Sequence, residues 1–128
     1  MACRLRGQDR PSPSVPSNLS VDVSAYDDGQ IWVVRLAGDL DVTSSEQLRT
    51  AVVRALTRHP RMVVVDLSAL DYADCSGLSV LVWAHRALAS DRRQLCVAGS
   101  HGAVRRLMQI TGADQTLVLV QAIPAPGE

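Results

Sequence analysis

The sequence predicts an α/β domain whose mixed, mostly parallel sheet is flanked by helices, in the order β-β-α-β-α-β-α-β. Short β-branched runs alternate along the chain with segments whose apolar residues recur at helical spacing. Turns rich in glycine, proline and aspartate separate these segments. Apolar residues make up 47% of the chain and are mainly aliphatic, with two Trp, two Tyr and no Phe. This composition is typical of sheets and helices packed in layers.

The first two predicted strands form an antiparallel hairpin. Residues 19–25 alternate weakly, and residues 31–36 form a stronger β-branched run. The turn between them is supplied by Asp27-Asp28-Gly29. The next segment, residues 43–56, opens with Thr43-Ser44-Ser45-Glu46, which matches a capping box. Apolar residues then recur at helical spacing, so a helix is predicted there.

The second half of the chain repeats the strand-then-helix pattern twice. Residues 62–67 are continuously apolar, which predicts a central strand covered on both faces, and the helix after Gly77 is apolar nearly all round. Residues 94–98 form another short buried strand. Ser100 is the expected cap of the third helix. A last strand is predicted over residues 116–120.

The two ends of the chain are expected to lie outside this domain, which we place at residues 19–121. Residues 1–18 are rich in proline and serine and predict a disordered tail, and residues 122–128 predict a flexible C-terminal end. No apolar segment follows the N-terminal arginines, as a secretory signal requires. No apolar run approaches the roughly 18 residues that cross a bilayer. We therefore expect a cytoplasmic protein without membrane insertion.

Composition argues against several function classes. The formal net charge is +0 at pH 7, which is not the footprint of a nucleic-acid-binding protein. The basic residues are all arginine, so a phosphate-loop, Schiff-base or general-base lysine is absent. The cysteines and histidines lack disulfide or metal-ligand spacing. Since no catalytic triad is readable either, we expect a protein that is not an enzyme and needs no cofactor or metal.

The most informative stretch is residues 66–82, which runs from a buried strand through a short polar connection into an apolar helix. Asp74, Cys75, Ser76 and Gly77 lie at the helix entrance, where free backbone N–H groups and the positive end of the helix dipole collect. A hydroxyl or thiol there suits a modified or partner-docking residue. The alternative is an ordinary cap, in which Asp74 accepts from the amide of Ser76 or Gly77.

Two further carboxylates follow the predicted strand at residues 31–36. Asp39 and Asp41 precede the capped helix. Right-handed crossovers bring the helix entrances to one edge of the sheet, so we expect both aspartates on the same rim as residues 74–77. A solvated turn is the alternative to a docking role.

Cys96, inside a predicted strand, is expected in the core.

Three blocks of sequence resemble those of a known family. They are residues 35–41 (Arg-Leu-Ala-Gly-Asp-Leu-Asp), residues 66–78, and residues 97–112, which end in Thr-Gly. In this order they resemble the STAS domain family, and within it the single-domain anti-sigma factor antagonists of bacteria. The middle block resembles the family's strand-to-helix signature, which usually reads Asp-Leu-Ser…Asp-Ser-Ser/Thr-Gly-Leu. The likeness covers residues 19–121.

The resemblance implies a binding module that takes part in partner switching. Such proteins, when unphosphorylated, bind an anti-sigma factor that is also a serine kinase of the GHKL ATPase type. They thereby free a sigma factor and regulate transcription, and phosphorylation by the kinase ends the binding. We expect the chain itself to be a monomer or a weak dimer. The resemblance implies these partner-binding residues: Asp39, Asp41, Asp74, Cys75, Ser76, Gly77 and Leu78.

One position departs from the family signature. The usual phosphoserine position is Cys75, and Ser76 takes the next one. One residue turns a side chain by about 100° around a helix, so a kinase aligned on position 75 would miss Ser76. We therefore expect the protein to bind its partner without being regulated by phosphorylation at position 75. Phosphorylation of Ser76 is the alternative. Two other functions stay open: a thiol-based redox sensor centred on Cys75, and a STAS subunit of a larger signalling or transport complex.

Overall fold

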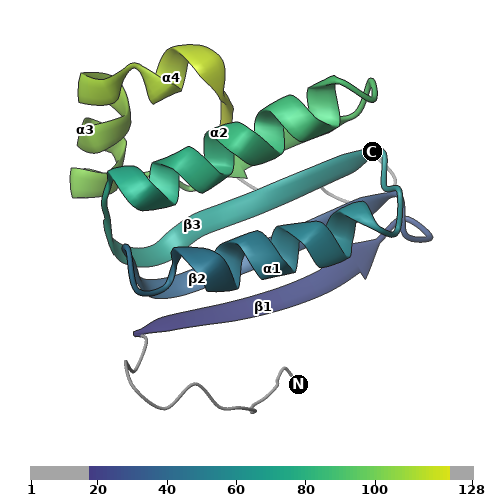
Figure 1. The fold of residues 1–128 in the computed structure, drawn as a ribbon, viewed down its shortest axis with the longest axis horizontal. Coiled ribbons are helices and arrows are strands. Elements are labelled where there is room, and N and C mark those ends of the chain that lie inside the picture. Colours follow the sequence, from purple (N-terminus) through teal and green to yellow (C-terminus); the bar gives the residue numbers. More distant parts are fainter. Residues whose placement is uncertain (1–17, 122–128) are drawn as a thin grey trace.

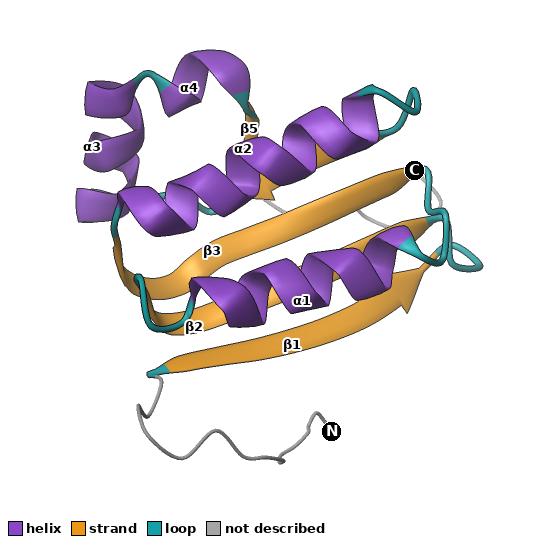
Figure 2. Cartoon of the chain, in the orientation of Figure 1, coloured by secondary structure: helices purple, strands orange, loops and turns teal. Residues whose placement is uncertain are grey.

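The computed structural model describes residues 18–121, which form a five-stranded sheet and the helices that pack on it (Figure 1; Figure 2). Residues 1–17 of the predicted tail, and the predicted end at 122–128, lie outside the described residues. The predicted order of elements is confirmed, with one short extra helix, α4. In chain order the elements are β1 (Leu19–Tyr26), β2 (Ile31–Leu40), α1 (Ser45–Leu56), β3 (Met62–Ala73), α2 (Cys75–Ala89), β4 (Gln94–Ala98), α3 (Gly102–Thr111), α4 (Ala113–Thr116) and β5 (Val118–Val120).

The order of the strands in the sheet is the order in the chain, β1-β2-β3-β4-β5. β1 pairs antiparallel with β2, and β2 to β5 are parallel. Right-handed crossovers between sequential parallel strands place their helices on one face. Figure 1 shows α1 and α2 crossing that face, with α3 and α4 beyond α2. The predicted mixed, mostly parallel sheet is therefore confirmed.

The larger hydrophobic core lies between this face and the helices. The apolar residues of α1 that are buried there, such as Leu48 and Val52, follow the predicted helical spacing. Each fully buried Val or Leu side chain stabilises the fold by about 1.5–3 kcal/mol. The fully buried side chains of this core include Val34 and Leu36 of β2, Val63, Val65 and Leu67 of β3, Leu81 and Leu88 of α2, and Met108 of α3.

The opposite face of the sheet carries a second, smaller cluster of buried residues. Val33 and Val64 are its centre, with Ile31, Cys96 and Ala98 around them. Successive residues of a strand point to opposite faces, so β3 buries Val63 and Val65 on one face and Val64 on the other. The prediction of a central strand covered on both faces is confirmed.

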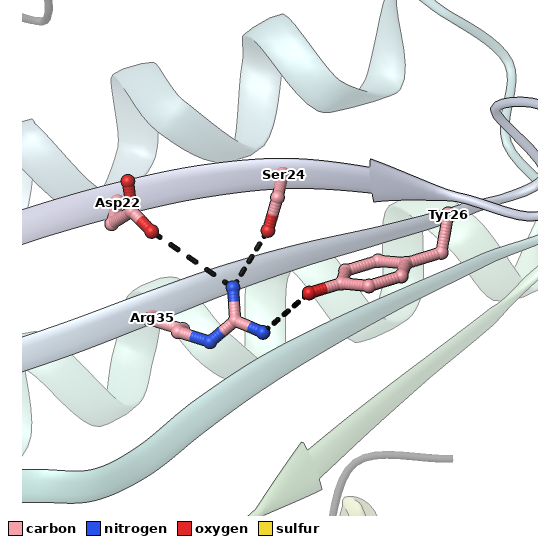
Figure 3. A network of polar contacts seen from close by, with 4 residues as sticks. All are labelled: Asp22, Ser24, Tyr26 and Arg35. Carbon is pink, nitrogen blue, oxygen red and sulfur yellow. Dashed lines mark hydrogen bonds and ion pairs between the residues drawn. The ribbon is translucent and has the colours of Figure 1, made fainter. Parts of the chain in front are cut away.

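Arg35 joins the two strands of the hairpin (Figure 3). Its guanidinium donates to the Ser24 hydroxyl at 2.6 Å and to the Tyr26 hydroxyl at 2.7 Å, and lies 3.9 Å from an Asp22 carboxylate oxygen. The pKa of Tyr26 is lowered, first by the hydrogen bond with Ser24 and then by that with Arg35. One cation of β2 thus contacts three side chains of β1, and these contacts hold the edge strand in register.

β2 and β3 run further than the sequence predicts. β2 continues to Leu40 rather than ending at residue 36, and β3 continues to Ala73 rather than residue 67. Their pairing shifts register twice, once on each side of Ala37–Gly38. Gly38 has φ 99° and lies against the backbone of Asn18. Such bulges interrupt the two-residue alternation from which strands are predicted.

Two predicted helix caps are wrong. Ser44 is the N-cap residue of α1, but its side chain makes no cap hydrogen bond, so the capping box does not form. The N-cap of α3 is His101 instead of Ser100, and it also lacks a side-chain cap. Its imidazole Nε2 lies 3.0 Å from the Ser68 carbonyl oxygen. In both cases the polar side chain contacts the preceding structure rather than the helix.

The last predicted strand begins too early. Gly112 ends α3 with φ 81°, and the chain then makes one further helical turn, α4. Leu117 is 5% exposed in the main core, and β5 covers only Val118–Val120. Thr116, predicted to start the strand, is the last residue of α4.

Candidate functional site

The carboxyl ends of β2 and β3 lie side by side and bring the predicted site residues to one edge of the sheet. Asp39 is paired with Tyr72, and Leu40 with Ala73. The backbone N–H of Asp74 donates to the Leu40 carbonyl oxygen at 3.1 Å. The loop after β2 and the start of α2 are therefore neighbours. We call this edge the rim; it comprises Asp39, Asp41, Val42, Asp74, Cys75 and Ser76.

Asp74 caps α2 through one carboxylate oxygen. Its Oδ1 accepts from the backbone N–H groups of Ser76 at 3.0 Å and Gly77 at 3.2 Å, and from the Ser76 hydroxyl at 2.5 Å. These bonds satisfy amides that have no partner within the helix. Of the two roles that the sequence allows for Asp74, the cap is confirmed, and the amides of both Ser76 and Gly77 donate to it. The half-buried Ser76 hydroxyl is held by the same carboxylate.

The other two carboxylates lie where β2 ends: Asp39 is its penultimate residue, and Asp41 is the first residue of the loop between β2 and α1. The Ser44 side chain has no exposed surface; its hydroxyl donates to the Asp39 carbonyl oxygen at 2.9 Å and accepts from the Asp41 N–H at 3.0 Å. Asp41 Oδ1 accepts from the Thr43 hydroxyl at 2.6 Å and the Thr43 N–H at 3.0 Å. The Thr43 hydroxyl is the main reason that the pKa of Asp41 is lowered. These bonds fix the loop.

Sequence reasoning missed one rim residue. Val42, between Asp41 and Thr43, is 72% exposed. An apolar side chain in an otherwise polar turn was the available signal. Isolated exposed apolar residues are common on proteins, but this one stands beside the carboxylates of the rim.

The two cysteines that the structure describes have opposite environments. Cys75 is exposed at the start of α2, and Cys96 is buried in β4. Burial raises the pKa of the Cys96 thiol. Cys96 therefore lies in the core, as predicted. Of the other predicted site residues, Gly77 and Leu78 are buried beneath the rim.

A groove that the sequence did not predict begins at Cys75. It has a volume of about 420 Å³ and runs between α2 and the α3–α4 segment. Its α2 wall is one stripe of the helix, and the opposite wall comes from the end of α3 and from α4. Its lining residues are Cys75, Leu78, Ser79, Val82, Trp83, Arg86, Thr111, Gly112, Ala113 and Thr116. Residues so far apart in sequence meet only in the folded chain.

Two further observations concern metal binding and membrane spans within residues 18–121. Within this range, no three His, Cys, Asp or Glu side chains gather closely enough to hold a metal ion. None of the helices in the same range is long and apolar enough to cross a membrane.

The model of the STAS domain family matches residues 22–123. The chain belongs to the STAS domain family. Among its relatives is the anti-sigma-B factor antagonist of Staphylococcus epidermidis, 30% identical over 95 residues that cover 74% of this chain and 86% of the relative. The protein of the same name from Staphylococcus aureus (strain NCTC 8325 / PS 47) is 27% identical over the same shares.

Solved structures resemble this STAS domain over most of its length. The crystal structure of an anti-sigma factor antagonist from Mycobacterium paratuberculosis has a TM-score of 0.75 and 26% identity, covering 87% of this chain and 92% of that one. The anti-sigma factor antagonist SpoIIAA in its unphosphorylated form has a TM-score of 0.65 and 18% identity, covering 81% and 90%. The second likeness concerns the fold alone.

Proposed function

We propose that this STAS domain is an anti-sigma factor antagonist. It binds an anti-sigma factor of the GHKL serine-kinase type through the rim and thereby frees a sigma factor for transcription. The names of the staphylococcal relatives and of the M. paratuberculosis structure support the class of function. The observation that carries the assignment to the rim is that the end of β2, with Asp39 and the following Asp41, is joined to Asp74 at the start of α2 by the Asp74–Leu40 hydrogen bond.

The geometry of the rim suits protein binding. Its loops are held by the buried Ser44 hydroxyl and by the Asp74 cap, so little conformational freedom remains to be lost on association. Carboxylates on such a surface favour a basic partner surface and speed its encounter. The exposed Val42 adds apolar area at the same place. We propose a binding module without enzymatic activity, active in the cytoplasm as a monomer or weak dimer.

The rim also bears on regulation. The family's phosphoserine position is occupied by Cys75, which is exposed but is no substrate for a serine kinase. The neighbouring Ser76 hydroxyl donates to Asp74, so transfer of a phosphoryl group to this hydroxyl would remove that hydrogen bond and place a phosphate beside the carboxylate that caps α2. We propose that phosphorylation at position 75 does not switch this antagonist off. The concentration of the antagonist in the cell would then control how much anti-sigma factor is bound.

A second candidate function rests on the exposed thiol. Cys75 opens α2 at the surface of the rim, where an oxidant or another thiol can reach it. A mixed disulfide or sulfenic acid at this position would change the surface offered to a partner. Thiol chemistry at Cys75 is thus an alternative way of controlling the same binding.

The test begins with capture of partners on the tagged chain in lysate of the source organism, with and without ATP, followed by mass spectrometry. We expect an anti-sigma factor of the GHKL ATPase type, and residues 74–77 without phosphate in both samples. Phosphate on Ser76 would contradict the regulatory proposal. A mixed disulfide on Cys75 without the ATPase would favour the redox function, and a large stable assembly would favour a subunit of a signalling or transport complex.

Affinity measurements on the purified pair then test the rim. Asp39→Asn combined with Asp41→Asn should weaken binding about tenfold or more, because two carboxylates lose their charge. Asp28→Asn is the matched control: it removes one charge from the hairpin turn at the other end of β2, and asparagine tolerates the φ of 56° there. Equal affinities for all three proteins would overturn the assignment to the rim.

A further inference from the structure

The groove beside α2 is continuous with the rim, because Cys75 belongs to both. Its α2 wall extends from Cys75 to Arg86, eleven residues further along the helix. At 1.5 Å per residue this wall is about 16 Å long. That length matches about three turns of a second helix lying in the groove.

The two ends of the groove carry opposite charge. Asp74 stands next to Cys75 at the rim end, together with the other carboxylates of the rim. The exposed Arg86 lies at the far end. The Arg49 guanidinium of α1 also lies 4.5 Å from the centre of the Trp83 ring, but it is paired with Glu46 at 3.5 Å, so Arg86 supplies the charge at this end. A segment bound along the groove would need a basic group at the rim end and an acidic group at the far end.

The middle of the groove is mainly apolar. Leu78, Val82, Trp83 and Ala113 line it, and both walls are helical. No strand of residues 18–121 lines the groove, so a bound peptide has no strand edge to pair with. Apolar grooves between helices take an amphipathic helix, which inserts side chains spaced three and four residues apart.

The most exposed apolar side chains of the described residues stand close to this path. Val42 is 72% exposed on the rim, and Ile110 is 74% exposed one residue before Thr111 of the groove wall. Val42 therefore adds apolar surface to the rim, and Ile110 adds an exposed apolar side chain to the helix whose last residue lines the groove. A partner that contacts both features would cover side chains that otherwise remain in water.

We propose that the groove receives an amphipathic helix of the same anti-sigma factor that binds the rim. This inference rests on the proposed function and names the second half of its contact surface. The partner helix has about three turns, an apolar stripe with i, i+4, i+7 spacing, a basic residue facing Asp74 and an acidic residue facing Arg86. The rim supplies electrostatic recognition, and the groove supplies apolar burial.

The proposal is tested by affinity measurements with the purified anti-sigma factor. Arg86→Glu reverses the charge at the far end, and Ser79→Tyr fills the groove from an exposed position on α2. We expect each variant to weaken binding about tenfold or more. Arg106→Glu is the matched control, because this exposed arginine of α3 lies outside the groove lining; its affinity should stay within twofold of wild type. Circular dichroism melts show that each variant is folded.

A crosslinking experiment identifies the occupant directly. A photoreactive amino acid in place of Ser79 should label residues of the anti-sigma factor that are spaced three and four apart within one helix. An arginine in place of the labelled helix's acidic residue should restore binding to the Arg86→Glu variant. Labelling of a loop, of a strand or of a second copy of this chain would overturn the proposal.

The outcomes separate this inference from the function on which it rests. If the wild-type chain binds no anti-sigma factor, the proposed function itself is wrong. If the double Asp39/Asp41 variant loses affinity while Arg86→Glu and Ser79→Tyr bind like wild type, the rim stands and the groove proposal is wrong. If the groove variants alter only self-association of the chain, the occupant is a second copy and the proposal is also wrong.

Discussion

Gly77 of α2 packs directly on Leu40 of β2. A β-carbon at position 77 would lie 2.5 Å from Leu40 Cγ and 3.3 Å from the Leu40 carbonyl oxygen. The same carbonyl accepts the hydrogen bond from the Asp74 N–H, and the Leu40 side chain has no exposed surface. Glycine at this position therefore lets the first turn of α2 approach β2 closely enough for the two halves of the rim to meet.

Replacing Gly77 by alanine should destabilise the fold. The added methyl group overlaps the side chain of a fully buried leucine at its Cγ, so we expect a loss of about 1–3 kcal/mol in the free energy of unfolding. Chemical denaturation of Gly77→Ala measures the loss. Ser79→Ala, at an exposed position two residues later on α2, is the matched control and should change stability by less than about 0.5 kcal/mol. Wild-type stability of Gly77→Ala would contradict the close contact.

The two roles of Asp74 can be separated by paired substitutions. Asp74→Ala removes the cap of α2 and should lower the free energy of unfolding by about 0.5–2 kcal/mol. Asp74→Asn keeps an oxygen that can accept from Ser76 and Gly77, so stability should remain near wild type. If the charge contributes to binding at the rim, Asp74→Asn should still weaken the anti-sigma factor complex. Equal binding by wild type and Asp74→Asn would assign this residue to the cap alone.

The ionisation of Asp41 should respond to Thr43. The Thr43 hydroxyl is the first cause of the lowered pKa of Asp41, so Thr43→Val should raise this pKa toward the ordinary aspartate value. A carboxyl group with a lowered pKa in the folded state stabilises above its unfolded pKa, and this contribution is lost as the pH falls through the folded pKa. Thr43→Val should therefore show a smaller loss of stability in acid. NMR titration of the Asp41 carboxyl carbon measures the shift, and an unchanged pKa would contradict the Thr43 contact.

The two described thiols should differ sharply in reactivity. In a Cys3→Ser background, which removes the cysteine outside the described residues, one equivalent of thiol reagent should react rapidly with Cys75. Cys96 should react only after denaturation, since it is buried and its pKa is raised. A Cys75→Ser variant of the same background should show no fast reaction. Rapid modification of two thiols in the folded protein would contradict the burial of Cys96.

The sequence was sufficient for those features that depend on local chemistry. The cap of α2 could be predicted because an aspartate before an apolar helix has amides two and three residues ahead to satisfy. The hydrogen bonds of the Ser44 side chain could not be predicted in this way. A serine before a helix can bond either to the helix or to the preceding loop, and the geometry of that loop depends on the bulges of β2. Composition similarly predicted an aliphatic core, but it did not predict which helix faces pack against which face of the sheet.

The groove required tertiary information. Trp83 and Arg86 belong to an α2 that reads as apolar nearly all round, so its sequence gave no reason to single out one stripe as a wall. The opposite wall depends on the turn at Gly112 and on α4, where the sequence predicted no helix and placed Thr116 in the last strand. The rim, in contrast, follows from parallel strands whose carboxyl ends must meet at one edge.

The agreement between strand order and chain order has a consequence for synthesis of the protein. Each new parallel strand adds to the edge that the preceding strand left open, so no later segment has to insert between two earlier ones. Assembly from contacts between successive segments favours rapid folding. Asp39, Asp41 and Asp74 belong to the first three strands and the connections after them. A nascent chain that has emerged only as far as α2 therefore already contains every residue of the rim.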